Sequence, residues 1–472
     1  MRTLVWFRGK DLRVHDHPPL LDAIAGGEVI PLFVLDPSFF APERARELPH
    51  RIQYLLGSLS ELAQTIAALG SRLVIVEGKS TQIVPRLAEQ WRVDRVVAHR
   101  WVEPFARERD RRIAATLTMP FTLYEGETLL PPGTLRTSSG GPFSVFTPFS
   151  RAFLSVAQIA RPLPAPARIP ALPRDVVTDS ATIPSTTSLG IEANPQVIAA
   201  GEKAAHARLK KFTDGFAAVY HHSRDQLADE NGTSRLSQDL KFGTLSARSV
   251  WHAVSARPAS RGITVFRNEL IWREFAHSTL WDRPDLLSHP FRAEFEGFPW
   301  REDEDGWRAW CEGRTGFPVV DAAARQLLAT GFVHNRARMI AASFLTRDLV
   351  IDYRRGEGHY LRWLTDGDWA QNNFGWQWSA GCGCDAQAYF RVFNPRLQGE
   401  KFDASGDYVR RWVPELSRLP SKWIHAPAAA PDAVLRDAGV AIGRDYPAPV
   451  VDHSAARERF LELAGRHVKT NR

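Results

Sequence analysis

Cysteine and long apolar runs are scarce in this sequence of 472 residues. Its three cysteines are an odd number, and no histidine lies at metal-ligand spacing from the pair in "CGC", residues 382–384. We therefore expect neither a disulfide framework nor a metal site. Charged residues follow the first apolar stretch closely, and no apolar run approaches about 18 residues, so we expect a cytoplasmic protein without a membrane span.

The N-terminal part also lacks the Gly-x-Gly-x-x-Gly fingerprint of an ordinary dinucleotide site. It contains instead short apolar runs that alternate with helical patterns, as in "VIPLFVL", "RLVIVEG" and "RIQYLLGSLSELAQTIAALG". This alternation predicts an α/β domain over residues 1–130, with a doubly wound parallel sheet whose ligands bind at the carboxyl ends of the strands.

Repeated proline and small polar residues follow, in "ARPLPAPARIPALPRD" and "SATIPSTTSLG". They cannot sustain a helix or a strand ladder, so we assign residues 131–200 to an inter-domain connector that can wrap over a domain surface. From residue 201 to 472 the periodicity is helical and strand signals are scarce, which predicts an all-helical second domain.

Aromatic residues and positive charge are abundant. The net charge of +7 and the isoelectric point near 9.4 fit a polyanionic partner, although many basic proteins have none. The 15 tryptophans exceed what core packing usually recruits. They favour stacking on flat ligands or electron transfer.

Three segments of the helical half have two interpretations each. In "NGTSRLS", residues 231–237, hydroxyls and an arginine ahead of a helix predict either a phosphate-binding turn or a plain helix cap. In "FRNELIWREF", residues 266–275, a carboxyl and an indole share a helix face, where they could read and stack a base or simply pack. In "HNRARMIAASF", residues 334–344, arginines could meet phosphates, while the methionine would fill the core.

The segment "DGDWAQNNFGWQW", residues 366–378, crowds two acids, two amides and three indoles together. The acids could serve a divalent cation or accept hydrogen bonds from a ribose or a heterocycle. Further oxygen ligands at metal-loop spacing are lacking, and arginines lie nearby. The pattern therefore favours a planar, redox-active ring over a cation.

With these segments in hand, the chain resembles the photolyase and cryptochrome family from end to end. The resemblance is carried by "LVWFRGKDLRVHD", "VFTPFSRAF", "GTSRLS", "NELIWREF", "HNRARM", "DGDWAQNNFGWQW" and "YFRVFNPRLQGEKFD", in the family's order. The branch it resembles most is that of the bacterial cyclobutane pyrimidine dimer photolyases. The resemblance implies an N-terminal antenna domain and a helical domain that holds reduced FAD in a U-shaped conformation.

The resemblance also implies a set of site residues. Those lining FAD are Tyr220, Thr233, Ser234, Arg235, Leu236, Ser237, Phe266, Arg338, Asp366, Gly367, Asp368 and Asn372. Those holding a flipped-out dimer for catalysis, together with the flavin-facing Asn372, are Glu269, Trp272, Asn335, Met339 and Trp378. Those contacting DNA are Arg224, Glu269, Trp272, Arg273, Asn335, Arg336 and Gln398.

Two residue types in this set bear on the activity. A neutral amide at Asn372 tolerates an anionic reduced flavin better than an aspartate would, which favours repair over photosensing. The branch that repairs six-four photoproducts has two histidines where this chain has Asn335 and Met339. The substrate expected from the resemblance is therefore UV-damaged DNA that contains cyclobutane pyrimidine dimers.

The chain departs from the family pattern at two places. Trp376 and Trp300 match the inner and outer members of an electron-transfer chain, but the middle position is Tyr353, which predicts slow photoreduction or a detour through another aromatic such as Trp363. Phe105 and Ala106 stand where folate-binding members have asparagine and glutamate. We therefore expect a deazaflavin or flavin antenna in preference to folate, or an empty antenna site.

The function predicted on this basis is light-driven repair by a monomeric deoxyribodipyrimidine photo-lyase. A cryptochrome-like blue-light photosensor is the alternative, and a light-independent nucleic-acid-binding flavoprotein is a third possibility. Glu269 and Met339, at repair-type positions, weigh against both rivals.

Overall fold

A computed structural model describes residues 1–177, 180–386 and 388–470. The chain divides into two compact units that do not follow a single cut in the sequence. The first unit comprises residues 1–221, 234–284 and 365–370, and the second comprises residues 222–233, 285–364 and 371–472. The domain limits expected from the sequence, at residues 130 and 200, therefore stay a prediction.

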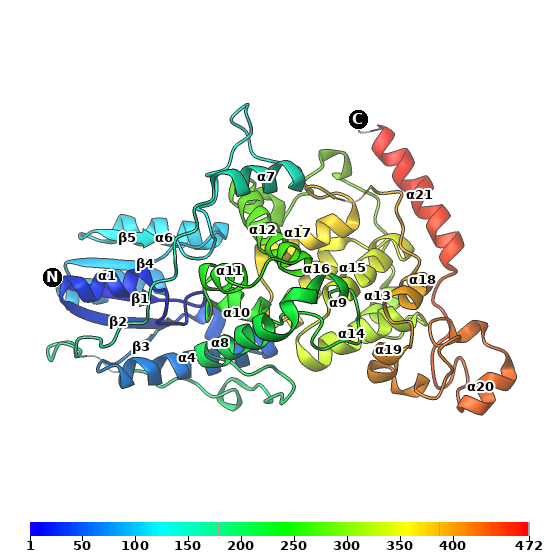
Figure 1. Cartoon of the computed structure of the whole chain (residues 1–472), viewed down its shortest axis with the longest axis horizontal. Coiled ribbons are helices and arrows are strands. Elements are labelled where there is room, and N and C mark those ends of the chain that lie inside the picture. The colour runs from blue at the N-terminus through cyan, green and yellow to red at the C-terminus, as the bar shows by residue number, and fades with distance from the viewer. Residues whose placement is uncertain (178–179, 387, 471–472) are drawn as a thin grey trace. The chain divides into compact units, whose positions relative to one another are not determined.

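The first unit is built on a parallel five-stranded sheet, whose strands are coloured blue to cyan in Figure 1. The strands are β1 (Arg2–Phe7), β2 (Glu28–Leu35), β3 (Val74–Glu77), β4 (Arg95–His99) and β5 (Phe121–Tyr124). Their order is β3-β2-β1-β4-β5, so the winding direction reverses between β1 and β4. Parallel sheets with this reversal bind ligands outside the carboxyl ends of the strands at the point of reversal.

Helices cover both faces of the sheet because alternate residues of each strand point to opposite sides. Val5 and Phe7 of β1 pack in one core with residues of α1 and α4, whereas Leu4 and Trp6 pack in another with residues of α5 and α6. The helices of the first unit include α1 (Pro18–Gly26), α2 (Pro37–Phe40), α3 (Pro42–Arg46), α4 (Pro49–Ala68), α5 (Ser80–Gln90), α6 (Pro104–Thr116), α7 (Phe146–Val156), α8 (Glu202–Lys211), α10 (Ser237–Phe242), α11 (Ala247–Ser255) and α12 (Arg261–Asp282).

The proline-rich segment after α7 packs on the first unit. The Ile169 amide donates to the Leu69 carbonyl at 2.8 Å, and the Ala181 amide donates to the Ile75 carbonyl at 2.8 Å. Leu189 is buried in the same core as α4. The segment therefore wraps over a domain surface, as the sequence allowed.

The second unit is helical and has one large hydrophobic core. Its centre combines Val320, Ile340, Tyr360, Trp376 and Phe460, which come from five helices. The remaining helices of the chain are α9 (Tyr220–Ser223), α13 (Glu304–Glu312), α14 (Pro318–Thr330), α15 (Asn335–Ser343), α16 (Tyr353–Trp363), α17 (Trp369–Ala380), α18 (Pro395–Phe402), α19 (Asp407–Trp412), α20 (Asp432–Ala438) and α21 (His453–Thr470).

The predicted fold class, a doubly wound α/β part followed by a helical part, is confirmed. In the described part of the chain, no helix is both long enough and apolar enough to cross a membrane.

Candidate functional site

Helix α12 carries Glu269, Trp272 and Arg273. Glu269 and Trp272 are one helical turn apart and half-buried, so the predicted pairing of a carboxyl with an indole on one face is present. Arg273 points elsewhere: its side chain is buried and donates from Nη1 to the Glu127 carbonyl at 2.6 Å. This position is at odds with the DNA contact predicted for Arg273, because a buried and bonded guanidinium cannot reach a phosphate in solvent.

Helix α15 brings together the other residues predicted to hold a lesion. The Asn335 amide lies 3.7 Å from the Met339 sulfur, one turn apart. Arg338, on the same helix, donates to the Val333 carbonyl at 2.8 Å. Arg336 forms an ion pair with Asp225 at 2.9 Å and lies over the Phe402 ring. Because Arg336 is half-buried and already paired, a phosphate could bind it only by competing with Asp225.

The remaining DNA and lesion positions lie in the second unit. Arg224, Gln398 and Trp378 are half-buried, so each keeps part of its side chain at the surface. Gln398 belongs to α18 and Trp378 to α17. Their partial exposure is compatible with the predicted contacts.

The turn "NGTSRLS" directly precedes α10, which begins at Ser237. Arg235 adopts a positive φ of 53°, an uncommon conformation for a residue with a side chain. The Gln238 side chain donates to the Arg235 carbonyl and fixes this conformation. Also in the first unit, the Tyr220 and Phe266 rings meet edge to face with centroids 5.2 Å apart. The predicted flavin residues of this unit therefore form a hydroxyl-bearing turn and an aromatic pair.

The acids of "DGD" lie in a loop between α16 and α17, and both are buried. Asp368 belongs to a cluster of buried charges whose centre is Lys10. The Lys10 ammonium donates to Asp368 at 3.0 Å and forms ion pairs with Glu103 and Glu127. The three carboxylates outweigh burial and raise the pKa of Lys10, so it stays charged. We call these residues, with His277, the Lys10 cluster.

The His277 ring lies between the Arg273 carbonyl and two carboxylates of this cluster. Its Nδ1 lies 2.8 Å from the Arg273 carbonyl, so Nδ1 must carry a proton there. Its Nε2 lies 3.3 Å from a Glu127 oxygen and 3.8 Å from an Asp368 oxygen. Burial raises the pKa of Glu103, while Lys10 and His277 hold the pKa of Glu127 near 2 despite its burial.

Asn372 is buried at the start of α17. Its amide nitrogen donates to the Glu357 carbonyl at 3.0 Å, which orients the side chain. The neighbouring Asn373 bonds the Glu357 carboxyl at 3.2 Å and the Leu286 carbonyl at 2.9 Å. Burial raises the pKa of Glu357 to about 7. Both asparagines therefore fix α17 to α16, and the side-chain oxygen of Asn372 remains as an acceptor.

The predicted electron-transfer residues Trp300, Tyr353 and Trp376 all lie in the second unit, and their order as one chain stays a prediction. Trp300 and Tyr353 are neighbours, with ring centroids 6.3 Å apart. Two aromatic rings pack next to Trp376: the ring centroids of Tyr360 and Trp310 lie 5.1 Å and 5.9 Å from its own. Trp310 in turn stacks on Trp307, with centroids 5.5 Å apart, and Trp307 is half-exposed. Sequence reasoning missed this second series because nothing in the spacing of Trp307 and Trp310 separates them from core residues.

A cavity of about 250 Å³ lies at the carboxyl ends of β1 and β2, in the first unit. Most of its aromatic wall is formed by Trp6, Phe33, Phe39, Phe40, Trp101, Phe105, Phe242 and Trp369. Its polar groups include Arg51, Lys241 and Glu103. Burial, Arg51 and Lys10 lower the pKa of Lys241 to about 7.

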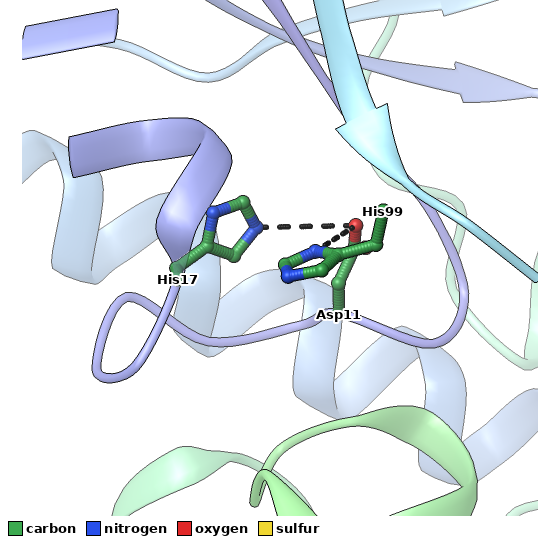
Figure 2. Close-up of side chains that lie close together, drawn as sticks. All are labelled: Asp11, His17 and His99. Atoms are coloured by element: carbon green, nitrogen blue, oxygen red, sulfur yellow. Dashed lines mark hydrogen bonds and ion pairs between the residues drawn. The ribbon is translucent and has the colours of Figure 1, made fainter. Parts of the chain in front are cut away.

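Asp11, His17 and His99 meet beside the same strand ends, where β1 and β4 are neighbours, and Figure 2 shows both rings turned toward one oxygen of Asp11. The distances to that oxygen are 3.2 Å from His99 Nδ1 and 3.9 Å from His17 Nε2. Three such groups could ligate a metal, but His17 Nδ1 accepts the Leu20 amide at 3.1 Å and caps α1. The proton of a neutral His17 ring must then sit on Nε2, which removes the lone pair that a metal needs. The geometry favours a buried polar network.

We expect this network to make the protein acid-sensitive. Burial lowers the pKa of both His17 and His99 well below the ordinary value near 6.5. Below pH 6.5 the two histidines become protonated in the unfolded chain but stay neutral in the folded chain. Each histidine therefore lowers the free energy of unfolding by about 1.4 kcal/mol for every pH unit of acidification. His17→Asn keeps a capping side chain and should remove one such contribution between pH 6 and 5 in urea denaturation. An unchanged slope would show that His17 is protonated in the folded state.

Comparison with known proteins places this geometry in a family. The model of the FAD binding domain of DNA photolyase matches residues 266–466, and the DNA photolyase model matches residues 3–168. A deoxyribodipyrimidine photo-lyase of Agrobacterium fabrum is 40% identical and aligns over 99% of this chain and 98% of its own. Among solved structures, a class III photolyase from Agrobacterium tumefaciens has a TM-score of 0.92 and 39% identity, covering 99% of this chain and 98% of its own. A Synechocystis cryptochrome has a TM-score of 0.91 and 30% identity, covering 98% and 99%.

The fold and the matching FAD-binding model thus define a two-unit flavoprotein, with an α/β part and a helical FAD-binding part. The chain belongs to the DNA photolyase family. The expected family membership and the expected FAD cofactor are confirmed. The residue roles derived from the resemblance stay predictions.

Proposed function

We propose that this photolyase repairs cyclobutane pyrimidine dimers in UV-damaged DNA with the energy of blue light. The observation that carries the proposal is the placement of Glu269 beside Trp272 on α12 and of Asn335 beside Met339 on α15. An acid and an indole suit the edge and the face of a pyrimidine. An amide and a soft thioether suit a second flat base without adding charge.

The residues of the chain bind, orient and stabilise the lesion. A dimer is poorly stacked in a duplex, so its extrusion costs only a few kcal/mol, which stacking on Trp272 and Trp378 can repay. The Glu269 carboxylate accepts a hydrogen bond from an N–H group on the pyrimidine edge and so orients the lesion. Arg224 and Gln398 contact the strand around the lesion, and phosphate neutralisation makes the affinity salt-dependent.

The donor groups also fit FAD. Thr233, Ser234 and Ser237 offer hydroxyls to a pyrophosphate, Asp366 and Asp368 offer buried acceptors, and Asn372 is a neutral amide. Reduced FAD, when bound, supplies the electron that light transfers to the dimer. The Lys10 cluster holds the Asp368 carboxylate in place, and the neutrality of Asn372 leaves a reduced, anionic ring undisturbed.

The decisive experiment mixes the reduced holoprotein with an oligonucleotide that contains one thymine dimer, with and without blue light. We expect intact thymines to be restored in light alone. Binding of the oligonucleotide without restoration under either condition would contradict repair. That result would favour the photosensor or the light-independent binding protein.

We further propose that the cavity at the ends of β1 and β2 holds a second chromophore with an acidic group, a deazaflavin or a flavin. Its aromatic wall can stack a flat ring, and Arg51 and Lys241 belong to its lining, where they can contact an anionic group. Phe105 is 42% exposed and lies 6.3 Å from Trp369, so it offers an aromatic face where folate binders carry polar side chains.

Lys241→Met tests this assignment. We expect the variant to keep its FAD and to bind added deazaflavin or flavin mononucleotide at least about tenfold more weakly, because one charge-assisted contact is worth about 1.5–3 kcal/mol. The measurement is fluorescence titration of the holoprotein. Equal binding by both proteins would place the chromophore elsewhere or leave the cavity without one.

Two further expectations, on the cellular location and on the oligomeric state, belong to this proposal. Cys311 and Cys382 are free thiols, which suits the reducing cytoplasm. A monomer also stays a prediction, which sedimentation of the holoprotein with and without DNA can test.

A further inference from the structure

One motif of the sequence, "VFTPFSRAF", has no role in the function proposed so far. It forms α7, which packs against α12 in the first unit. Phe146, the first residue of α7, stacks on Trp272 with ring centroids 3.6 Å apart and planes inclined by 4°. The indole that we place against the lesion therefore has one of its two faces covered by a phenyl ring.

This parallel stack is imposed by its surroundings. Isolated aromatic pairs prefer offset or edge-to-face arrangements over a parallel sandwich. The neighbouring pairs follow that preference: Phe149 and Phe275 are tilted by 36°, and Phe143 meets Phe149 nearly edge on at 83°. Phe149 and Phe275 are both buried and anchor α7 on α12. Their packing holds Phe146 over the indole.

The stack has a geometric consequence for any base that binds here. A flat pyrimidine can stack on Trp272 only from the face opposite Phe146. The Phe146 ring also prevents the indole of Trp272 from rotating into the space that the phenyl ring occupies. The binding of a base then needs no further ordering of the indole, a cost that otherwise weakens binding.

We propose that Phe146 is a positioning residue for Trp272: it sets the plane and the accessible face of the indole against which an extruded pyrimidine stacks. This inference rests on the proposed function, which places Trp272 against the lesion. Phe146 touches no reacting atom, so it acts on the affinity for damaged DNA and leaves the photochemical step unchanged.

The test uses holoprotein variants and two oligonucleotides, one undamaged and one with a single thymine dimer. Phe146→Leu removes the flat ring and keeps apolar bulk, while Phe146→Tyr keeps the ring. Phe143→Leu is the matched control, because it makes the same chemical change in the same segment. Phe143 packs on Phe149. Dissociation constants are measured in the dark, and repair per absorbed photon is measured with saturating oligonucleotide.

We expect Phe146→Leu to raise the dissociation constant for the damaged oligonucleotide about tenfold, as the loss of one pre-ordered stacking side chain implies. Affinity for undamaged DNA and repair at saturation should stay as in the wild type, Phe146→Tyr should restore binding, and Phe143→Leu should have no effect. Unchanged affinity in Phe146→Leu would overturn the inference. Equal losses in Phe146→Leu and Phe143→Leu would also overturn it, because the cause would then be the packing of α7.

A further variant, Trp272→Leu, separates this inference from the proposed function. If Trp272→Leu weakens binding of the damaged oligonucleotide and Phe146→Leu does not, only the inference on Phe146 fails. If Trp272→Leu binds the damaged oligonucleotide as tightly as the wild type, the lesion does not stack there, and both fail together.

Discussion

Replacing Lys10 by methionine is expected to destabilise the first unit by about 3–5 kcal/mol, the cost of removing one partner from a buried group of charges. Lys10 is the ammonium that Glu103, Glu127 and Asp368 share. Methionine fills a similar volume but leaves these carboxylates buried without it. We expect the loss in urea denaturation of the holoprotein at pH 7, together with weaker retention of FAD, because Asp368 is predicted to line that cofactor.

Lys241→Met is a matched control for this prediction. Lys10 is buried and Lys241 is half-buried, and both lie at the cavity, yet the charges around them shift their pKa values in opposite directions. Lys10 is stabilised as a cation by three acids, whereas burial, Arg51 and Lys10 hold the pKa of Lys241 at about 7. Removing the Lys241 ammonium should therefore change the stability at pH 7 by less than about 1 kcal/mol.

The dependence on pH distinguishes electrostatics from packing. In the wild type Glu127 has a pKa near 2, so it takes up no proton between pH 7 and 5. In Lys10→Met the uncompensated acids should have raised pKa values and bind protons that the unfolded chain does not bind at pH 5. The free energy of unfolding of the variant should then recover toward that of the wild type on acidification. A deficit that is constant from pH 7 to 5 would mean that the loss is one of packing.

The Lys10 cluster also shows where sequence reasoning stops. The alternation of apolar runs with helical patterns predicted the sheet, because burial of both faces dictates that pattern locally. It could not predict that Lys10 would meet Asp368, since 358 positions separate them and no spacing rule relates them. The segment "DGD" was recognisable as a site, but its partners come from the tertiary fold.

The aromatic residues show the same limit. The positions of Glu269 and Trp272 one turn apart followed from helical periodicity, and the structure has them on one helix. Nothing in the sequence indicated that Phe146 would stack on Trp272, or that Arg273, the next residue, would be buried. A motif identifies residue types, while the direction of each side chain depends on what packs around its helix.

The second large effect is expected at Trp376. Trp376→Phe should slow light-driven reduction of oxidised FAD at least about tenfold, equivalent to about 1.4 kcal/mol in the barrier, because phenylalanine does not replace indole as an electron donor. Transient absorption of the oxidised holoprotein with an external thiol measures this rate. Repair by chemically reduced enzyme should persist, since repair does not need electron transfer through these aromatic residues. Loss of repair together with photoreduction would mean that the substitution damages the flavin site itself.

Three further variants, at Trp310 and Tyr353, decide the rest of the route. Tyr353 is buried, and burial raises its pKa. Among the residues that the structure describes, its hydroxyl has no hydrogen-bond partner to receive a proton, so its oxidation is unfavourable. Trp310 lies 5.9 Å from Trp376 and connects it to the half-exposed Trp307. We therefore expect Trp310→Phe to slow photoreduction and Tyr353→Phe to leave it unchanged. Tyr353→Trp should then accelerate photoreduction little, because electrons already reach Trp376 from Trp310. The opposite pattern, with loss in Tyr353→Phe alone, would show that the buried phenol carries the electron despite the raised pKa of its hydroxyl.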